Sequence, residues 1–292
     1  MSTQMNKTVV KKINNNTFSN EVKKIYYANI IARMTSKFNL EEEKALHIFF
    51  SYIKPFNFQN STTIKIEKKK FFEQLNLTGD DKYKRYKLLI YKMKIKSIII
   101  IETEKSIFDG FLLISSEWYK KELYFEVDLN PKLMPFIEQL KEHYTKVDLN
   151  TVCSFKSKHA LTLYKFLCSW TNENKKENKR YVTTKDLKEL FGLSKEAYVE
   201  NKNFKRAKFE KRTIDVAIKE INQYSDLNIN YDKKKENGKV KKYQFIWVQK
   251  DKQIVKSLEI NKTNQNQNTI SKEQMNDILT NIDKDDEVVF DK

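Results

Sequence analysis

Apolar positions between Tyr198 and Asn222 recur at spacings of three, four and seven residues, which predicts one amphipathic helix. At about 100° per residue, the apolar side chains gather on one face of this helix. That face consists of Phe204, Ala207, Ile214, Ala217, Ile218 and Ile221. Six cations gather on the opposite face and its flanks: Lys202, Lys205, Arg206, Lys208, Lys211 and Arg212. Glu210 is the only carboxylate among them, so the pattern is either a solvated lysine-rich face or a surface for a polyanion.

The segments around this basic helix follow the order of a winged helix. The predicted elements are helices over 155–170, 183–191 and 204–222, and strands over 227–231 and 243–247. The first helix is apolar on more than one stripe, which predicts that it is covered on two sides. Thr184 is the predicted cap of the short second helix, and Gly192 ends it. Asn237–Gly238 predicts the turn of a β-hairpin wing with a basic tip.

The first half of the chain shows the same order of elements. Its predicted helices cover 20–34, 40–53, 68–75, 80–96 and 131–144, and its strands cover 64–66, 97–102, 111–115 and 123–127. Asp109–Gly110 predicts a turn, and 146–151 a connector between the halves. On the 80–96 helix, Lys84, Arg85 and Lys87 point away from the apolar face.

The fold class predicted from these patterns is α+β and helix-rich, with two tandem winged-helix domains and small antiparallel β-hairpin wings. The first domain is expected over 20–145 and the second, DNA-binding domain over 146–250. A flexible polar arm is expected over 1–19. Residues 251–292 read as a polar linker, a short amphipathic helix at 271–282 and an acidic tail.

The charge balance favours a polyanionic partner, because 56 basic and 39 acidic residues give a net charge of +17. A membrane surface is the other polyanion to consider, but no basic amphipathic helix with a bulky apolar face stands at either end. The sequence also has no apolar run of membrane-spanning length and no signal-peptide core, so we expect a cytoplasmic protein without a membrane partner. The two cysteines, Cys153 and Cys168, predict no disulfide framework.

The residues that enzymes commonly use are sparse. The four glycines lie far apart, so the sequence forms no phosphate-binding loop and no dinucleotide fingerprint. The three histidines are isolated, and without Cys clusters or a His pair the usual metal ligands are missing. We therefore expect no enzyme activity and no cofactor.

Four motifs of the second half are the most specific: SKHALTLYKFL at 157–167, VTTKDLKELFGL at 182–193, FKRAKFEKRTIDVAIKEIN at 204–222 and YQFIWV at 243–248. They resemble segments of the replication initiators of iteron-controlled, theta-replicating plasmids. The residues that match the family pattern are Ser157, Ala160, Leu163, Tyr164, Phe204, Lys205, Arg206, Glu220, Ile221 and Asn222. The first half matches more loosely.

The resemblance implies two winged-helix domains that bind directly repeated origin DNA. It also implies host DnaA and the replicative helicase as partners, and family members often repress their own gene as homodimers. Arg206 is the candidate for reading a base, because its planar fork pairs with both acceptors of guanine. The family often has another Arg near the 198–202 turn, where this chain has Glu200 and only Lys202 supplies charge.

The remaining cations divide into two groups. Lys205, Lys208, Lys211 and Arg212 are candidate phosphate contacts, which fix register without reading sequence. For the wing set and the first-domain set, phosphate contact and simple solubility stay open. These sets are Lys233, Lys234, Lys235 and Lys239 in the wing, and Lys84, Arg85 and Lys87 in the first domain.

Two alternative functions remain at this point. A plasmid-borne transcriptional regulator would have the same domains without a role in replication. A rolling-circle nickase would use a tyrosine nucleophile, although the missing His pair speaks against it.

Overall fold

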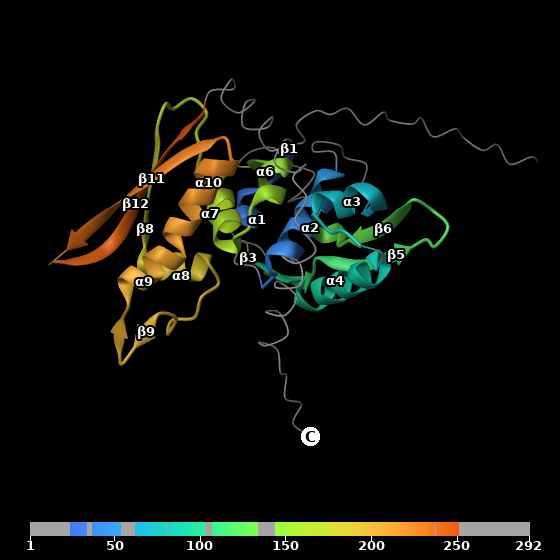
Figure 1. Ribbon diagram of the computed structural model, residues 1–292, viewed down its shortest axis with the longest axis horizontal. Coiled ribbons are helices and arrows are strands. Elements are labelled where there is room, and N and C mark those ends of the chain that lie inside the picture. The colour runs from blue at the N-terminus through green and yellow to red at the C-terminus, as the bar shows by residue number, and fades with distance from the viewer. Residues whose placement is uncertain are drawn as a thin grey trace, which may run out of the picture.

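The computed structural model describes residues 24–33, 37–53, 62–79, 81–102, 107–133, 144–236 and 238–250. The predicted N-terminal arm, the linker, helix and tail after 250, and most of the helix predicted over 131–144 lie outside these residues. Within them the chain forms two lobes, with the first half on one side and the second half on the other (Figure 1).

The second lobe has the predicted winged-helix order. It consists of α7 (Lys158–Cys168), β8 (Asn178–Thr183), α8 (Thr184–Leu190), β9 (Val199–Glu200), β10 (Asn203–Phe204), α9 (Arg206–Arg212), α10 (Ile214–Tyr224), β11 (Leu227–Glu236) and β12 (Lys239–Gln249). The strands β11, β12 and β8 form one antiparallel sheet in that order. Buried residues occur on every side of α7, which confirms that this helix is covered on more than one side.

The cap of α8 is Thr183 rather than the predicted Thr184. The Thr183 side chain accepts a hydrogen bond from the Asp186 amide, and the Asp186 carboxylate accepts one from the Thr183 amide. This capping box needs the hydroxyl one residue before the helix and an acidic side chain three positions later, which only Thr183 satisfies. Gly192 follows the helix with a φ of 67°, as predicted for a residue that ends it.

The single basic helix predicted over 204–222 is wrong, because it is interrupted at Thr213. This residue has φ −118° and ψ −68°, and its hydroxyl donates 2.7 Å to the Phe209 carbonyl. A side-chain bond of this kind competes with the helical ladder and bends it. Phe209, Ala217 and Ile221 are buried, whereas Ala207 is exposed, so the apolar face assigned from the wheel does not extend through the break.

The residues before Arg206 form a two-stranded hairpin rather than a helix. Strands β9 and β10 pair Glu200 with Asn203, so Asn201 and Lys202 make a two-residue turn. Their φ values are 50° and 63°, the left-handed values that a type I′ turn requires. Lys202 therefore lies at the tip of a hairpin that leads directly into α9.

The first lobe also has the predicted order of helix, short helix, longer helix and hairpin. It contains β1 (Lys24–Ala28), α1 (Asn29–Arg33), α2 (Leu40–Ser51), β2 (Thr63–Glu67), α3 (Lys68–Gln74), α4 (Lys82–Lys96), β3 (Ile98–Glu102), β4 (Ile107–Phe111), β5 (Leu113–Trp118), β6 (Tyr124–Leu129), the 3-10 turn η1 (Pro131–Leu133), β7 (Tyr144–Asp148) and α6 (Leu149–Ser154). Its antiparallel sheets have the orders β2-β6-β5, β3-β4 and β1-β7.

Asp109–Gly110 does not form the predicted turn, because both residues lie inside β4 opposite Ile100 and Ile99. A Cβ at position 110 would lie 2.8 Å from the tip of the Phe108 ring. The glycine therefore provides room for that ring rather than a turn conformation.

In the described part of the helix predicted over 20–34, only residues 29–33 are helical, as α1, and the connector predicted over 146–151 is wrong. Residues 24–28 form β1, which pairs antiparallel with β7 over 144–148, and the chain continues from β7 directly into α6. Ile25 and Tyr27 are buried at alternate positions, which is the period of a strand. The segment forms a strand rather than a helix because it pairs with β7, far along the chain. The predicted domain boundary between 145 and 146 falls inside β7.

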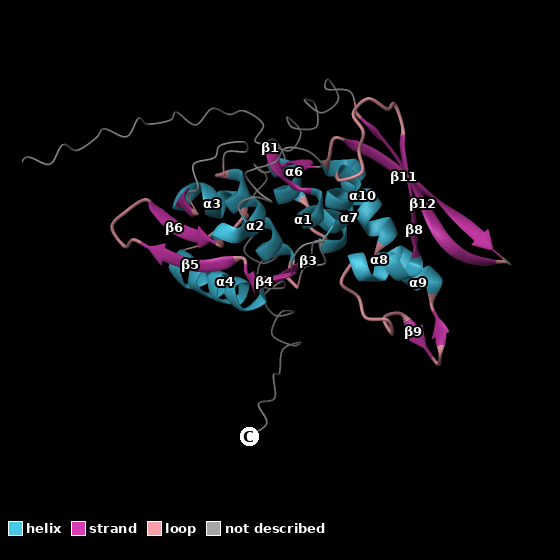
Figure 2. Cartoon of the chain, turned by 180° about the vertical axis from the view of Figure 1, so that it is seen from behind, coloured by secondary structure: helices cyan, strands magenta, loops and turns pink. Residues whose placement is uncertain are grey.

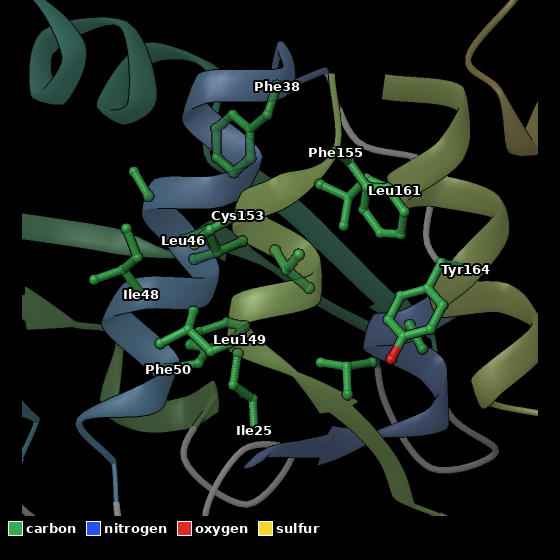
Figure 3. Packing of buried hydrophobic residues seen from close by; sticks show 14 of the residues in the cluster. Ile25, Phe38, Leu46, Ile48, Phe50, Leu149, Cys153, Phe155, Leu161 and Tyr164 are labelled. Atoms are coloured by element: carbon green, nitrogen blue, oxygen red, sulfur yellow. The ribbon is translucent and has the colours of Figure 1, made fainter. Parts of the chain in front are cut away.

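The core where the lobes meet lies between α2, α6 and α7. Figure 3 shows Leu46 of α2, Cys153 of α6, and Leu161 and Tyr164 of α7 in this region. A buried ion pair links the same helices: Lys165 Nζ lies 2.9 Å from Glu43 Oε2, with side-chain exposures of 7% and 2%. No helix in the described part of the chain is long and apolar enough to cross a membrane.

Candidate nucleic-acid interface

The cations predicted to bind DNA in the second lobe surround α9 and the β9–β10 hairpin. Lys202 is exposed at the hairpin tip, and Lys205 is exposed immediately before α9. Lys208, Lys211 and Arg212 are exposed on α9 itself, whereas Arg206, its first residue, is half-buried. The N-terminal part of a winged-helix recognition helix is the part that enters a major groove, so this is the expected place for base contacts.

A chain of hydrogen bonds holds Arg206 at the start of α9. Its Nη1 donates 3.2 Å to the hydroxyl of Tyr243 in β12, and that hydroxyl donates 2.9 Å to Glu210 Oε1. Glu210 Oε2 accepts from Lys233 Nζ of β11 at 2.5 Å, with the Glu210 side chain only 7% exposed. The guanidinium also lies 5.4 Å from the centre of the Phe204 ring. Burial and the bond to Glu210 raise the pKa of Tyr243 to about 12.

Lys208 takes part in a separate ion pair on the solvent side. Its Nζ lies 2.7 Å from Glu200 Oε1 of β9, and both side chains are about half exposed, at 46% and 49%. The hydrogen bond from Lys208 and its charge lower the pKa of Glu200. A pair this exposed exchanges readily with water, so Lys208 can transfer from Glu200 to a phosphate.

The predicted wing is a hairpin with longer strands than expected. Lys233, Lys234 and Lys235 lie in β11, and a bulge interrupts the pairing between Lys234 and Lys235. Lys239 is the first residue of β12, opposite Glu236. The lysines therefore lie along the hairpin near its turn, and Lys233 contacts Glu210 instead of projecting freely.

The predicted first-domain cations lie on the exposed face of α4. Lys84, Arg85 and Lys87 are exposed. Among the described residues, Lys84 has a loose 4.0 Å contact with Asp81, and Arg85 donates a 3.3 Å bond to the Thr78 carbonyl. Both α4 and α9 lie toward the same long side of the molecule in the two opposite views (Figures 1 and 2).

Two features of the site were missed at the sequence level. Lys120 and Lys121 are exposed in the turn between β5 and β6, so the first lobe has a basic wing of its own. Glu210 and Tyr243 join the recognition helix to the sheet, and the sequence did not predict this contact. A lone carboxylate among six cations was the available signal for Glu210.

The described residues contain no group of three or more His, Cys, Asp or Glu side chains arranged to hold a metal ion. Cys153 is buried, and burial raises the pKa of its thiol to about 12. This thiol behaves as a small apolar side chain, because a thiol with so high a pKa is a poor nucleophile.

Comparisons with known proteins agree with this architecture. A family model described as "Initiator Replication protein, WH1" matches residues 24–168, and one described as "Initiator Rep protein, WH2" matches residues 183–247. Among solved structures, the Pi initiator protein in complex with iteron DNA is similar, with a TM-score of 0.67 and 17% identity over 80% of this chain and 100% of that chain. Domains 2 and 3 of RctB match with a TM-score of 0.40 and 10% identity, over 74% of this chain and 85% of that chain. The two family models and the likeness to Pi confirm the tandem winged-helix fold.

Proposed function

The chain belongs to the initiator replication protein family, with a WH1 and a WH2 domain in tandem, and from this premise we propose that it binds repeated sequences in a plasmid origin and starts replication there. The observation that carries the proposal is the α9 surface. Six cations lie on α9 and in the segment just before it, and one of them, Arg206, is held by a network of hydrogen bonds. The fold shared with the Pi initiator, which was crystallised with iteron DNA, supports the same type of target.

In this proposal Arg206 reads a base, while Lys205, Lys208, Lys211 and Arg212 bind phosphates on either side. The cations of α4 and of the two wings add phosphate contacts. The buried Glu43–Lys165 pair and the core between α2 and α7 support a fixed relation between the two lobes. We therefore expect one chain to protect about two turns of duplex as one block, because successive major grooves lie about 34 Å apart.

Opening of the origin would follow from the binding itself. Bound protein stabilises distorted DNA, and recruitment of host DnaA and the replicative helicase completes the step. We further propose that the chain catalyses no reaction and that a homodimer represses its own gene. A gel assay for covalent protein–DNA adducts, with Mg²⁺ or Mn²⁺ present, tests the first statement, because a tyrosine nickase would leave an adduct.

The test of the main proposal uses the full chain and the DNA that flanks its gene. The expected result is a footprint over direct repeats beside an AT-rich tract, with replication of a minimal plasmid lost when Arg206 becomes Ala. Binding to a promoter alone, with plasmid replication unaffected by this substitution, would instead favour a transcriptional regulator.

A further inference from the structure

The polar side chains between α9 and the wing form one continuous chain of contacts. Lys233 bonds to Glu210, Glu210 accepts from Tyr243, and Tyr243 accepts from Arg206. The two ends are cations from the wing and from the recognition helix. The two middle members are almost fully inside, since Tyr243 is 0% exposed and Glu210 is 5% exposed.

Burial determines which group donates and which accepts in each hydrogen bond between these side chains. A carboxylate removed from water is costly unless its oxygens find donors, and here each Glu210 oxygen has one. The Tyr243 hydroxyl has one proton, which points to the carboxylate, so its oxygen is left as an acceptor for Arg206. Hydrogen bonds in such a chain polarise one another, which strengthens the bond to the guanidinium.

The bond uses only a part of the guanidinium. Arg has five donors in a fixed fork, and Tyr243 engages Nη1. The remaining donors can still form the paired contact with a guanine edge. An anchored fork loses less rotational freedom on binding DNA than a free side chain, so the contact with the correct base becomes more favourable.

Resting on the function proposed above, we propose that Glu210 and Tyr243 are positioning residues that orient Arg206 for base reading and thereby set sequence specificity. Neither residue touches DNA in this account. Lys233 closes the chain from the wing, so the recognition helix and the wing approach DNA as one unit.

The chain offers a matched control for this role. Tyr231 lies in the neighbouring strand, with its ring 5.9 Å from that of Tyr243, and its hydroxyl donates 2.9 Å to Asp215 of α10. Both tyrosines thus join a helix to the sheet by one phenol–carboxylate bond. Of these two tyrosines, Tyr243 is the one whose hydroxyl accepts a hydrogen bond from Arg206.

The experiment compares two DNA duplexes with the full-length protein. One duplex is enriched by the wild-type chain from a randomised pool, and the other is a shuffled duplex of the same composition. The measured quantity is the discrimination ratio, which is the dissociation constant for the shuffled duplex divided by that for the selected duplex, at one salt concentration. Thermal unfolding of each variant reports whether its fold is retained.

Tyr243→Phe removes one buried oxygen and keeps the ring. We expect the ratio to fall about 3- to 10-fold, as for the loss of one hydrogen bond, while binding to the shuffled duplex stays within about 2-fold. Tyr231→Phe should leave the ratio unchanged. In an Arg206→Ala background, Tyr243→Phe should cause no further loss of discrimination, because the residue that it positions is gone.

Glu210→Gln should change the affinity for the shuffled duplex and the discrimination ratio in opposite directions. It removes a negative charge beside the interface, so binding to the shuffled duplex should tighten while the ratio falls. A purely structural role would weaken both together.

Equal losses on both duplexes, an unchanged ratio in Tyr243→Phe, or a full Tyr243→Phe loss in the Arg206→Ala background would overturn the inference. If the wild-type chain enriches no sequence from the pool, the proposed function itself fails and the positioning role fails with it. Enrichment by the wild type without any effect of Tyr243→Phe defeats the positioning role alone.

Discussion

In chain order, α4 follows the short helix α3 and α9 follows the short helix α8, but the cations of α4 and α9 are held in different ways. On α4 the cations Lys84, Arg85 and Lys87 are exposed, and among the described residues Lys84 has a 4.0 Å contact with Asp81 and Arg85 a 3.3 Å bond to the Thr78 carbonyl. On α9 the first cation, Arg206, is half-buried and bonded to a buried phenol. The cations of α4 are therefore exposed to solvent, whereas α9 begins with a guanidinium that is held by a hydrogen bond to Tyr243.

This difference matters because phosphates and bases require different kinds of contact. A phosphate can be approached by a cation from many directions, so a lysine side chain can bind it without being held in one orientation. A base edge requires donors at defined positions, so a pre-oriented fork is favoured. We infer that α4 contributes affinity and α9 contributes sequence preference.

The largest expected effect concerns salt. If about eight phosphates are neutralised, log affinity should fall with log salt at a slope of about −7, or roughly 10⁴-fold between 50 and 200 mM. Replacing Lys84, Arg85 and Lys87 together by Ala should reduce the slope by about 3 and weaken both duplexes equally. A salt titration in which the triple variant keeps the wild-type slope would remove α4 from the interface.

The next effect concerns the rigidity that places the two helices on one side. Lys165→Ala removes the buried cation that lies 2.9 Å from the Glu43 carboxylate, which should lower the free energy of unfolding by about 3 kcal/mol. Lys96→Ala is the matched control, because Lys96 pairs with buried Glu42 at 2.9 Å but is itself 35% exposed. Water can reach Lys96, so Lys96→Ala should lower the free energy of unfolding, measured in urea, by less than Lys165→Ala does. Equal losses would show that the junction pair is not special.

Arg206→Ala directly tests the division of roles. It should weaken the selected duplex by about 1–3 kcal/mol and affect the shuffled duplex much less. Lys208→Ala, two residues further along α9, should weaken both duplexes alike, because its ion pair with Glu200 is exposed and its target is a phosphate. Competition binding with both duplexes makes the comparison, and parallel losses in the Arg206 variant would contradict base reading.

The smallest effect concerns the hairpin before α9. Lys202 has a φ of 63°, a conformation that glycine adopts without strain. Lys202→Gly should therefore raise the free energy of unfolding slightly, by about 1 kcal/mol at most. The same change removes one exposed cation and should reduce the salt slope by about 1. A clear destabilisation in thermal unfolding would mean that the side chain has a structural role.

The sequence predicted α4 well because the evidence for it is local. The apolar positions recur at helical spacing: Tyr83, Tyr86, Leu89, Ile90 and Met93. The last four are buried, whereas Tyr83 is exposed. It failed for β1, because the choice between strand and helix depends on pairing with β7, which no local period reveals. It also missed the break at Thr213, where a helical wheel averages over a change of direction.

The candidate site shows the same limit. The cations around α9 could be named from their charge, but the helical wheel placed Lys202 on a helix, whereas it lies in the turn between β9 and β10. The burial of Glu210 could not be predicted, because its partners Lys233 and Tyr243 lie 23 and 33 positions further along the chain. Carboxylates are usually exposed, so only the folded arrangement reveals that this one is inside.

The most direct test of the account is a base-analogue experiment on Arg206. Each guanine of the selected duplex is replaced in turn by 7-deazaguanine, which lacks the N7 acceptor, and affinity is measured for the wild type, Arg206→Ala and the α4 triple variant. The account predicts one guanine per repeat at which the wild type and the triple variant lose about 1–3 kcal/mol while Arg206→Ala loses nothing further. If Arg206→Ala is as sensitive as the wild type at every guanine, α9 does not read sequence through this residue.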